Sequence, residues 1–314
     1  MKKHDILVVG ELNIDLILDR IPVFPVLGKE ILADKMELVL GSSSAILASN
    51  LASLGVNVAF IGKLGKDDFG DFVLDCLKDR GVFTGFIKRD SSVKTGATII
   101  LNYPEDRAMV THKGAMDALT LQDIPAADLQ TARHMHLSSY YLQDGIRNDC
   151  PALFKMAQDA GLTTSLDTNW DPAEEWGKEI FEVLACVDVF LPNHQEAMLI
   201  TGRKSVERAL DELARYARTV VIKLGKEGAV GRQNDMTTRI NAYRVKQVDA
   251  VGAGDSFNSG FLYKFLQGAA LEECMGMGNA CGALSVTKAG GTAAFQNKDQ
   301  IRKDLKELLS YNLN

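Results

Sequence analysis

The chain has 314 residues, of which 46% are hydrophobic and 24% are charged, and its formal net charge is −6. A chain of this length and apolar content can bury a sizeable core, which excludes a disordered protein. The acidic balance argues against a general nucleic-acid binder, because such proteins carry a basic surface.

The cysteines and the apolar runs indicate the compartment. The five cysteines form no CxxC pair, so neither a zinc ribbon nor a redox dithiol is indicated. The first apolar run, residues 6–10, is too short for the core of a signal peptide. No segment approaches the ~20 apolar residues that a membrane span needs. We therefore expect a cytoplasmic protein with reduced thiols and no membrane partner.

Short β-branched runs alternate with amphipathic helical patterns along most of the chain. Such alternation predicts α/β architecture, with a doubly wound, mostly parallel sheet and helices on both faces. We expect strands at 6–10, 56–62, 163–167, 187–192 and 219–225, and helices at 69–81, 151–161 and 206–218.

Two regions break this alternation. Residues 12–40 and 95–112 carry strand-like pieces without an intervening helix, which predicts hairpins in a small second sheet. In an α/β enzyme such a sheet serves as a lid over the carboxyl ends of the main strands. No linker divides the chain, so we expect one domain over 1–314 with a small β lid.

The stretch VDAVGAGDSFNSG, residues 248–260, combines small residues with two acids just before a helical pattern. Three phenylalanines follow at helical spacing, so the helix is expected to begin near Asp255. Small residues at a helix N-terminus leave backbone N–H groups open to an anion. The alternative is that Asp255 merely caps the helix. The anion site would consist of Gly252, Ala253 and Gly254.

Two common phosphate-binding signatures are missing. No GxxxxGK[ST] motif occurs, and no GxGxxG follows the first strand. A P-loop enzyme and a dinucleotide-binding oxidoreductase are therefore disfavoured.

The stretch VDAVGAGDSFNSGFL resembles the C-terminal signature of the ribokinase-like carbohydrate kinases, the phosphofructokinase B family. GSSSAILASNLASLG (41–55) and IGKLGKDDFG (61–70) together resemble the N-terminal signature of that family. NHQE (193–196) matches its NxxE motif, and KLGKEG (223–228) matches a strand and loop on its nucleotide side. The resemblance extends over nearly the whole chain and implies a ribokinase-like fold.

The resemblance implies that the γ-phosphoryl group of ATP is transferred to a hydroxyl of a sugar-type acceptor. Asp255 would be the general base that takes the proton of that hydroxyl. The amides of Gly252, Ala253 and Gly254 would form the anion hole for the transferred group.

Asn193 and Glu196 stand three residues apart after an expected strand, which places them on one face of a helix. The resemblance implies that they help to hold Mg²⁺ through water, since this ion keeps much of its water shell. The alternative is a capping box at the helix start, and the two roles can coexist.

The acceptor side is expected near Asn13 and Asp15, whose alternation after the first strand points both side chains to one side. The resemblance implies that the aspartate binds sugar hydroxyls. Gly41 and Ser42 stand where the family has a glycine pair, and Ile46 stands where it has an asparagine that touches the sugar.

Asp167 and Asn169 also alternate after a buried strand, and we expect both to bind substrate. In several kinases of the family an arginine follows these positions, whereas Trp170 and an aspartate follow here, which weakens a sugar-acid interpretation. Arg107 and Lys113 in the lid region could meet an acidic or phosphorylated acceptor, but each is more often a solvated charge. The sequence therefore does not identify the acceptor.

The nucleotide side is implied by the resemblance alone. Asn279 would touch the adenine, the alternative being an N-cap or a surface amide. Asp249 and Ala250 are candidates for a potassium site made of backbone carbonyls. The residues expected to line the phosphates, the ribose and the base are Lys223, Gly225, Gly228, Asn279 and Gly290.

Three further expectations complete the prediction. A nucleoside kinase of the same superfamily and a non-catalytic sugar or nucleotide sensor are alternatives, although the retained Asp255 favours catalysis. A lid with apolar strand faces favours a homodimer. His134 and His136 alternate on an expected strand, and hydrogen-bonded core histidines are favoured there over zinc ligands.

Overall fold

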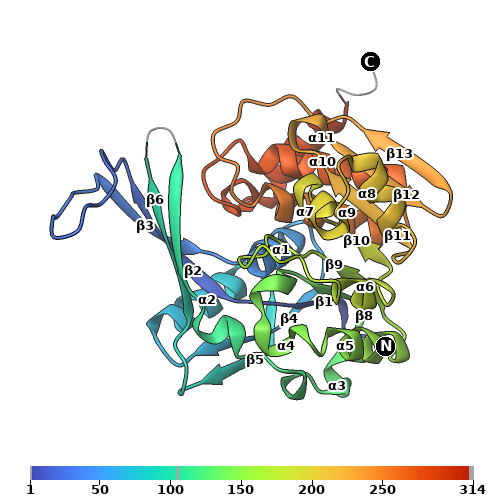
Figure 1. Ribbon diagram of the computed structural model, residues 1–314, viewed down its shortest axis with the longest axis horizontal. Coiled ribbons are helices and arrows are strands. Elements are labelled where there is room, and N and C mark those ends of the chain that lie inside the picture. The colour runs from blue at the N-terminus through green and yellow to red at the C-terminus, as the bar shows by residue number, and fades with distance from the viewer. Residues whose placement is uncertain (1, 104–105, 311–314) are drawn as a thin grey trace.

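The computed structural model describes residues 2–103 and 106–310, and in this part of the chain nine strands form one central sheet (Figure 1). The strand order is β13-β12-β11-β10-β9-β8-β1-β4-β5. Pairing is parallel from β5 across to β11, and only β12 and β13 are antiparallel. The strands are β1 (His4–Val9), β4 (Val58–Gly65), β5 (Phe83–Asp90), β8 (Ala132–Leu137), β9 (Thr163–Leu166), β10 (Val189–Phe190), β11 (Thr219–Lys223), β12 (Ala229–Gln233) and β13 (Met236–Ile240).

Helices cover both faces of this sheet. Along β1, Leu7 and Val9 belong to one apolar core, while Ile6 and Val8 belong to another, as expected of a strand buried on both faces. The first core is covered by α3 (Ala126–Leu129), α4 (Asp144–Arg147), α5 (Cys150–Asp159), α6 (Ile180–Leu184), α7 (His194–Thr201) and α8 (Val206–Leu213). The second is covered by α1 (Ser43–Ser53), α2 (Asp68–Asp79), α9 (Ala253–Phe265) and α10 (Leu271–Ser285), and α11 (Lys298–Ser310) packs on α10.

The expected mostly parallel sheet is therefore confirmed, with two local differences. The helix expected at 206–218 ends at Leu213, because the chain needs the next residues to turn back into β11. The strand expected at 187–192 is reduced to the two residues of β10, although an isolated bridge between Asn193 and Lys223 continues its pairing with β11.

A separate small sheet comes from the two regions without helices. Within the described residues it has four strands in the order β3-β2-β6-β7, and it projects from one side of the molecule (Figure 1). Two antiparallel hairpins, β2 with β3 and β6 with β7, are joined by parallel pairing of β2 with β6. The strands are β2 (Asn13–Asp19), β3 (Lys35–Leu40), β6 (Gly96–Asn102) and β7 (Arg107–His112).

A search of the described helices for one both long and apolar enough to cross a bilayer finds none.

Candidate active site

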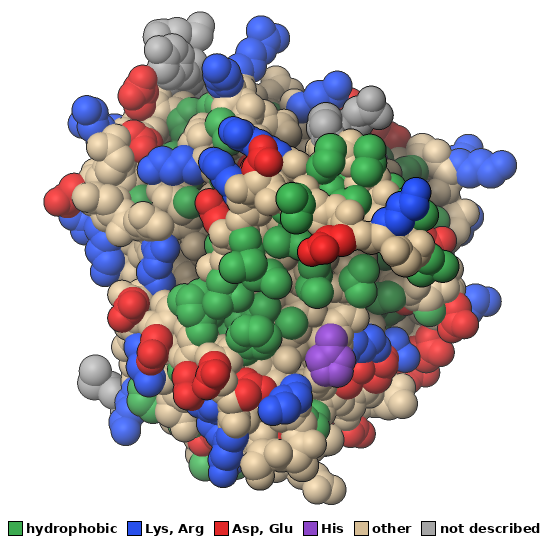
Figure 2. Space-filling view, turned by 90° about the vertical axis from the view of Figure 1, so that its left-hand side faces the viewer, with side chains coloured by type: hydrophobic (Ala, Val, Ile, Leu, Met, Phe, Trp, Pro, Cys, Tyr) green, Lys and Arg blue, Asp and Glu red, His purple; other side chains and the backbone are tan. Residues whose placement is uncertain are grey.

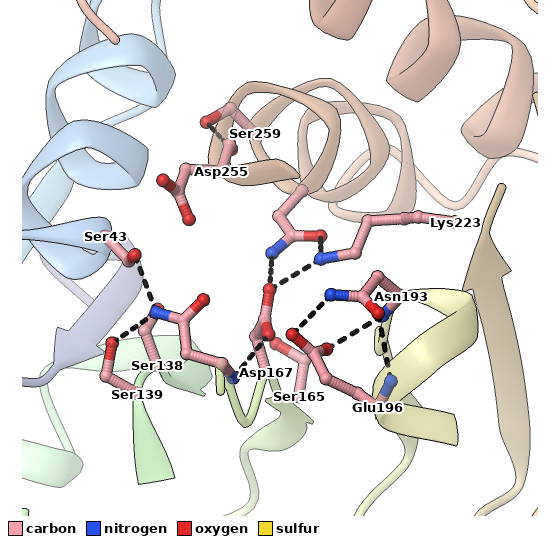
Figure 3. A network of polar contacts seen from close by, with 12 residues as sticks. Ser43, Ser138, Ser139, Ser165, Asp167, Asn193, Glu196, Lys223, Asp255 and Ser259 are labelled. Atoms are coloured by element: carbon pink, nitrogen blue, oxygen red, sulfur yellow. Dashed lines mark hydrogen bonds and ion pairs between the residues drawn. The ribbon is translucent and has the colours of Figure 1, made fainter. Parts of the chain in front are cut away.

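The carboxyl ends of the parallel strands bring distant polar residues together. Asp167 follows β9, Asn193 follows β10 and Lys223 ends β11, and the N-terminus of α9 lies opposite them (Figure 3). Parallel strands collect their loops at one edge of the sheet, which is where α/β proteins bind ligands. The sequence places these residues far apart, and the strand order makes them neighbours.

The first turn of α9 is built around Gly252. This glycine has φ 72°, a left-handed conformation, and a Cβ there would lie 2.5 Å from the Cα of Gly291. Gly252 is also the N-cap residue, and no side chain caps the helix. The alternative in which Asp255 is the cap is therefore wrong, and the carboxylate is directed away from α9 toward the strand ends (Figure 3).

Asp255 is a buried acid in a negatively charged neighbourhood. Burial, and then the charge of Asp167, raise the pKa of Asp255 to about 7, although Lys223 and a hydrogen bond with Ser43 oppose this shift. A carboxyl group with a pKa near neutrality can accept a proton and release it again at the pH of a cell.

Lys223, at the end of β11, is held by side chains from the loop after β9 and from α9. Its Nζ lies 2.7 Å from Asp167 Oδ2 and 3.3 Å from Asn258 Oδ1, and Asn258 Nδ2 donates to the same carboxylate oxygen. Burial is the largest influence on the pKa of Asp167 and raises it, but the charge and hydrogen bond of Lys223, together with hydrogen bonds from Asn169 and Asn258, hold this pKa below its usual value. Asp167, expected to bind the acceptor, is thus paired with the lysine expected on the nucleotide side.

Asn193 and Glu196 form the capping box that the sequence offered as an alternative. The backbone N–H of Asn193 donates to Glu196 Oε2 at 2.8 Å, and the N–H of Glu196 donates to Asn193 Oδ1 at 3.0 Å. Burial, and then the charge of Asp167, raise the pKa of Glu196 to about 7. Three carboxyl groups therefore interact around one lysine, an excess of negative charge that suits a cation.

The donor set fits a magnesium ion that is held mostly by other ligands. Among the residues that the structure describes, no three His, Cys, Asp or Glu side chains lie close enough to hold a metal ion by themselves. Mg²⁺ prefers oxygen ligands and commonly uses one or two carboxylates together with water and phosphate oxygens. Glu196, whose carboxyl group interacts with Asp167, Lys223 and Asp255, suits such a role.

Asn13 and Asp15 lie on one side of β2, as their alternation predicts. Asn13 Nδ2 donates to Asp15 Oδ1 at 3.1 Å and to Thr98 Oγ1 at 3.2 Å. Gly41 backs this pair, because a Cβ at Gly41 would overlap the Asp15 carboxylate. Burial raises the pKa of Asp15 to about 6. These residues make a polar corner where β2 meets the N-terminus of α1.

The turn before α1 is strained and is held by side chains. Ser42 has φ 70°, which is unfavourable for a residue other than glycine, and its Oγ accepts from the N–H of Ala45 at 2.9 Å. The next residue, Ser43, accepts a hydrogen bond from Asn169 Nδ2 at 2.6 Å. The same amide donates to Ser139 Oγ at 2.7 Å, so Asn169 joins the turn to the end of β8.

Ile46 fills the space beside the glycines of the site. Its side chain is buried and lies against both Gly252 and Gly291. The asparagine contact expected of the family is thus replaced by apolar packing. Lys113, just after β7, forms ion pairs with Asp144 and Asp117 rather than being left free for an acceptor.

A large cavity is lined by the two residues that precede Asp255. Its volume is about 1320 Å³, and four of the residues expected on the nucleotide side line it, together with Ala250, Ala253 and Gly254. The four are Lys223, Gly225, Gly228 and Asn279.

Asn279 lines the cavity, as expected of a residue on the nucleotide side, whereas Gly290 does not. Asn279 is neither an N-cap nor a surface amide, since it lies buried within α10 and donates to the carbonyls of Ile240 and Asn241. Gly290 lies outside the lining of the cavity, and its N–H donates to Asp249 Oδ2 at 2.9 Å. Asp249 thereby ties the turn that contains Gly290 to the loop before α9.

His134 and His136 lie on β8 in a buried chain of hydrogen bonds. Ser165 Oγ is 2.7 Å from His134 Nε2 and 2.7 Å from His136 Nδ1. Burial lowers the pKa of His134 to about 3 and that of His136 to about 4, so both rings are neutral. They are the hydrogen-bonded core histidines that the sequence favoured.

Sequence reasoning missed several residues of the site. Glu11 lies two residues after the end of β1, and its place after a strand could have identified it. Asn258 stands three residues after Asp255, on the same face of α9, which is also a readable signal. Ser43 and Ser139 carry no such signal, because serine is common in turns.

The fold and the site have relatives among known proteins. The family model for pfkB family carbohydrate kinases matches residues 3–298. The chain is 30% identical over 286 residues to the 2-dehydro-3-deoxygluconokinase of Bacillus subtilis, a match that covers 83% of this chain and 85% of that protein. It is 28% identical over 281 residues to fructokinase-1 of Oryza sativa subsp. japonica, covering 84% of this chain and 87% of that protein.

Solved structures show the same architecture. The ribokinase of Arabidopsis thaliana, solved in complex with ribose and ATP, matches with a TM-score of 0.84 at 22% identity. The match covers 96% of this chain and 99% of that one, and it confirms the ribokinase-like fold. With the family model matched from residue 3 to residue 298, the chain belongs to the pfkB family of carbohydrate kinases and is an ATP-dependent carbohydrate kinase.

Proposed function

We propose that the protein transfers the γ-phosphoryl group of ATP to a hydroxyl group of a sugar-type acceptor. One observation carries this proposal. Ala253 and Gly254 line the large cavity, and the carboxyl group of the next residue, Asp255, lies within reach of the Ser43 hydroxyl, which lowers its pKa. Three consecutive residues thus face both reactants, as a direct transfer between them requires.

Asp255 acts as the general base. The acceptor hydroxyl gives its proton to the carboxylate as its oxygen bonds to phosphorus, and the bond from phosphorus to ADP breaks. The amides of Gly252, Ala253 and Gly254 stabilise the charge on the moving group, aided by the positive end of α9. Asn13, Asp15, Gly41 and Ser42 hold the acceptor, with Asn169 and Asp167 at its far side.

The ions have candidate residues. Glu196, with Asn193, would hold Mg²⁺, which neutralises charge on the nucleotide phosphates. Asp249, Ala250 and the turn with Gly290 are the candidates for potassium. The nucleotide would lie along Lys223, Gly225, Gly228 and Asn279 in the cavity beside α9.

We propose further that residues 1–314 form one kinase domain in which the small sheet is the lid, and that two copies pair through it. The described surface supports pairing, because exposed hydrophobic side chains gather on the side that carries this sheet (Figure 2). All five cysteines are free thiols, which supports a reducing compartment such as the cytoplasm.

The identity of the acceptor distinguishes a sugar kinase from the two alternatives, a nucleoside kinase and a non-catalytic sensor. The relatives named above act on a sugar acid and on fructose, and a nucleoside kinase would reshape the corner around Asp15 for a base. A sensor without catalysis would have no need of Asp255 beside the glycine turn.

The experiment measures ATP turnover with a panel of sugars, sugar acids, sugar phosphates and nucleosides. We expect phosphorylation of one acceptor class, and a loss of roughly 10²- to 10⁴-fold in kcat for Asp255→Asn with ATP affinity retained. Asp75→Asn, at an exposed acid on α2, is the matched control and should keep full activity. Near-normal turnover by Asp255→Asn would refute the base assignment. A ligand that raises the Tm but is not phosphorylated would favour a sensor.

A further inference from the structure

Glu11 is a buried acid that the proposed reaction does not use. It follows β1 at the carboxyl edge of the sheet, and its side chain is only 3% exposed. Its carboxylate accepts from Ser44 Oγ and, at 3.4 Å, from the N–H of Ser44. Burial raises the pKa of Glu11, and hydrogen bonds with Ser44 and Ser139 oppose this rise. Across the described residues, no ion pair to Glu11 occurs.

Burying an acid without a cation is unfavourable unless its oxygens are well satisfied. Here the compensation comes from the first turn of α1, whose free N–H groups and positive dipole attract a carboxylate. Ser42 already caps this helix, so Glu11 is a second acceptor at the same end. A cap alone therefore does not account for Glu11.

The main chain of Glu11 holds the same turn from its other side. Ser42 Oγ donates to the carbonyl oxygen of Glu11 at 2.7 Å. Ser42 is the residue with left-handed φ, so this bond stabilises a strained conformation. Gly10 permits the close approach, because a Cβ there would overlap the side chain of Ser44. Glu11 thus grips the turn at Ser42 through its main chain and at Ser44 through its side chain.

Ser43 lies between these two anchors and faces the reaction. Its hydroxyl accepts from Asn169 Nδ2 at 2.6 Å and lies near enough to Asp255 to lower the pKa of that carboxyl group. Gly41, just before the anchors, packs against Asp15. The clamp formed by Glu11 therefore determines the position of the turn relative to Asp255, the proposed base, and to the polar corner of Asn13 and Asp15, where the acceptor is proposed to bind. We call this corner the acceptor corner.

We propose that Glu11 is a positioning residue, which clamps the turn Ser42–Ser44 so that Ser43 and Gly41 meet the acceptor beside Asp255. This inference rests on the proposed function. Glu11 does not touch the reacting atoms; it acts through the turn, and its charge contributes in a smaller measure to the raised pKa of Asp255. The acceptor side should therefore depend on Glu11, while the ATP cavity across α9 should not.

The test compares Glu11→Gln and Ser44→Ala with the wild type in acceptor and ATP kinetics. Glutamine keeps the size of the side chain but cannot accept from Ser44 as both oxygens of a carboxylate do. We expect each variant to raise the KM for the acceptor and lower kcat, with kcat/KM reduced about tenfold or more and the KM for ATP within about twofold. The double variant should be no worse than either single one, because both break the same clamp.

Asp188→Asn is the matched control. Asp188 accepts from the N–H of Thr164 at 2.9 Å and from its hydroxyl at 3.3 Å, the same kind of clamp at the opposite edge of the sheet. The Asp188→Asn substitution should alter the stability of the protein but change neither the KM for the acceptor nor the KM for ATP. An equal loss of acceptor affinity in Asp188→Asn would assign Glu11 a merely structural role.

Hydrogen exchange tests whether Glu11 holds the turn, independently of any enzymatic activity. The amides of residues 43–46 should exchange faster in Glu11→Gln than in the wild type, and they should be unchanged in Asp188→Asn. Unchanged exchange, or kinetics equal to those of the wild type, would overturn the proposal. A wild-type protein that phosphorylates no acceptor would overturn the proposed function instead, and exchange would still test the clamp.

Discussion

At the residue scale, burial sets the protonation of the acids around α9. Burial, and then the charge of Asp167, raise the pKa of Asp255 to about 7 from its ordinary value of 3.8. The folded chain therefore binds this proton more tightly than the unfolded chain does. The stabilisation is complete below about pH 4 and is lost as the pH rises through about 7. A carboxyl group whose pKa suits the proposed proton transfer thus destabilises the resting fold.

Asp255→Asn should remove this dependence, since asparagine resembles the protonated acid at every pH. We expect its free energy of unfolding to match that of the wild type near pH 4 and to exceed it at pH 8. Three pKa units set an upper bound of about 4 kcal/mol for that gain. Urea unfolding at both pH values, without nucleotide, measures it. Glu196 titrates in both proteins, but the charge of Asp255 adds to the rise of its pKa, so part of the difference between the two proteins arises through Glu196. A difference that is equal at both pH values would contradict the prediction.

At the element scale, the sequence predicted the helices and strands themselves better than the contacts between them. It predicted the start of α9 near Asp255, because helical spacing and small residues are local signals. It could not show that Gly252 has left-handed φ against Gly291, because this contact joins two distant loops. Nor could it pair Asp167 with Lys223, because that contact depends on β10 lying between β9 and β11.

Gly252→Ala tests the role of the turn before α9. The substitution adds strain at φ 72° and places a Cβ 2.5 Å from the Cα of Gly291. We expect a loss of stability of about 1–3 kcal/mol and a fall in kcat of roughly 10²-fold, because the amides of the anion hole shift. Thermal unfolding and turnover measure the two effects.

Gly268→Ala is the matched control for this turn. Gly268 has φ 74°, but a Cβ there would meet nothing within 4 Å. It should cost about 1 kcal/mol in stability and leave kcat unchanged. Equal kinetics in the two variants would show that the turn before α9 is not part of the anion site.

At the scale of the whole molecule, the small sheet has two chemically different faces. Register places Leu38, Leu16, Ile99 and Val110 in one row across the four strands. The neighbouring row, on the other face, contains Asp15, Thr98 and Thr111 at the acceptor corner. The sequence predicted both hairpins from local patterns, whereas the parallel pairing of β2 with β6 joins residues far apart in the chain.

The apolar row predicts where two copies meet. Leu38, Ile99 and Val110 are 38%, 40% and 64% exposed, and Figure 2 shows hydrophobic side chains gathered on this side. Such a patch on a folded protein marks an interaction surface, and the same row on a second copy would cover it. Val110→Glu should therefore yield a monomer at concentrations where the wild type is a dimer, as light scattering measures.

Met109→Glu is the matched control, because Met109 is 58% exposed and adjoins Val110 but belongs to the opposite face. A charge there should leave the dimer intact and instead alter the KM for the acceptor, since this face carries Asp15. Dissociation by both substitutions would mean that pairing does not depend on the apolar row. A wild-type mass that stays monomeric at every concentration would rule out the dimer.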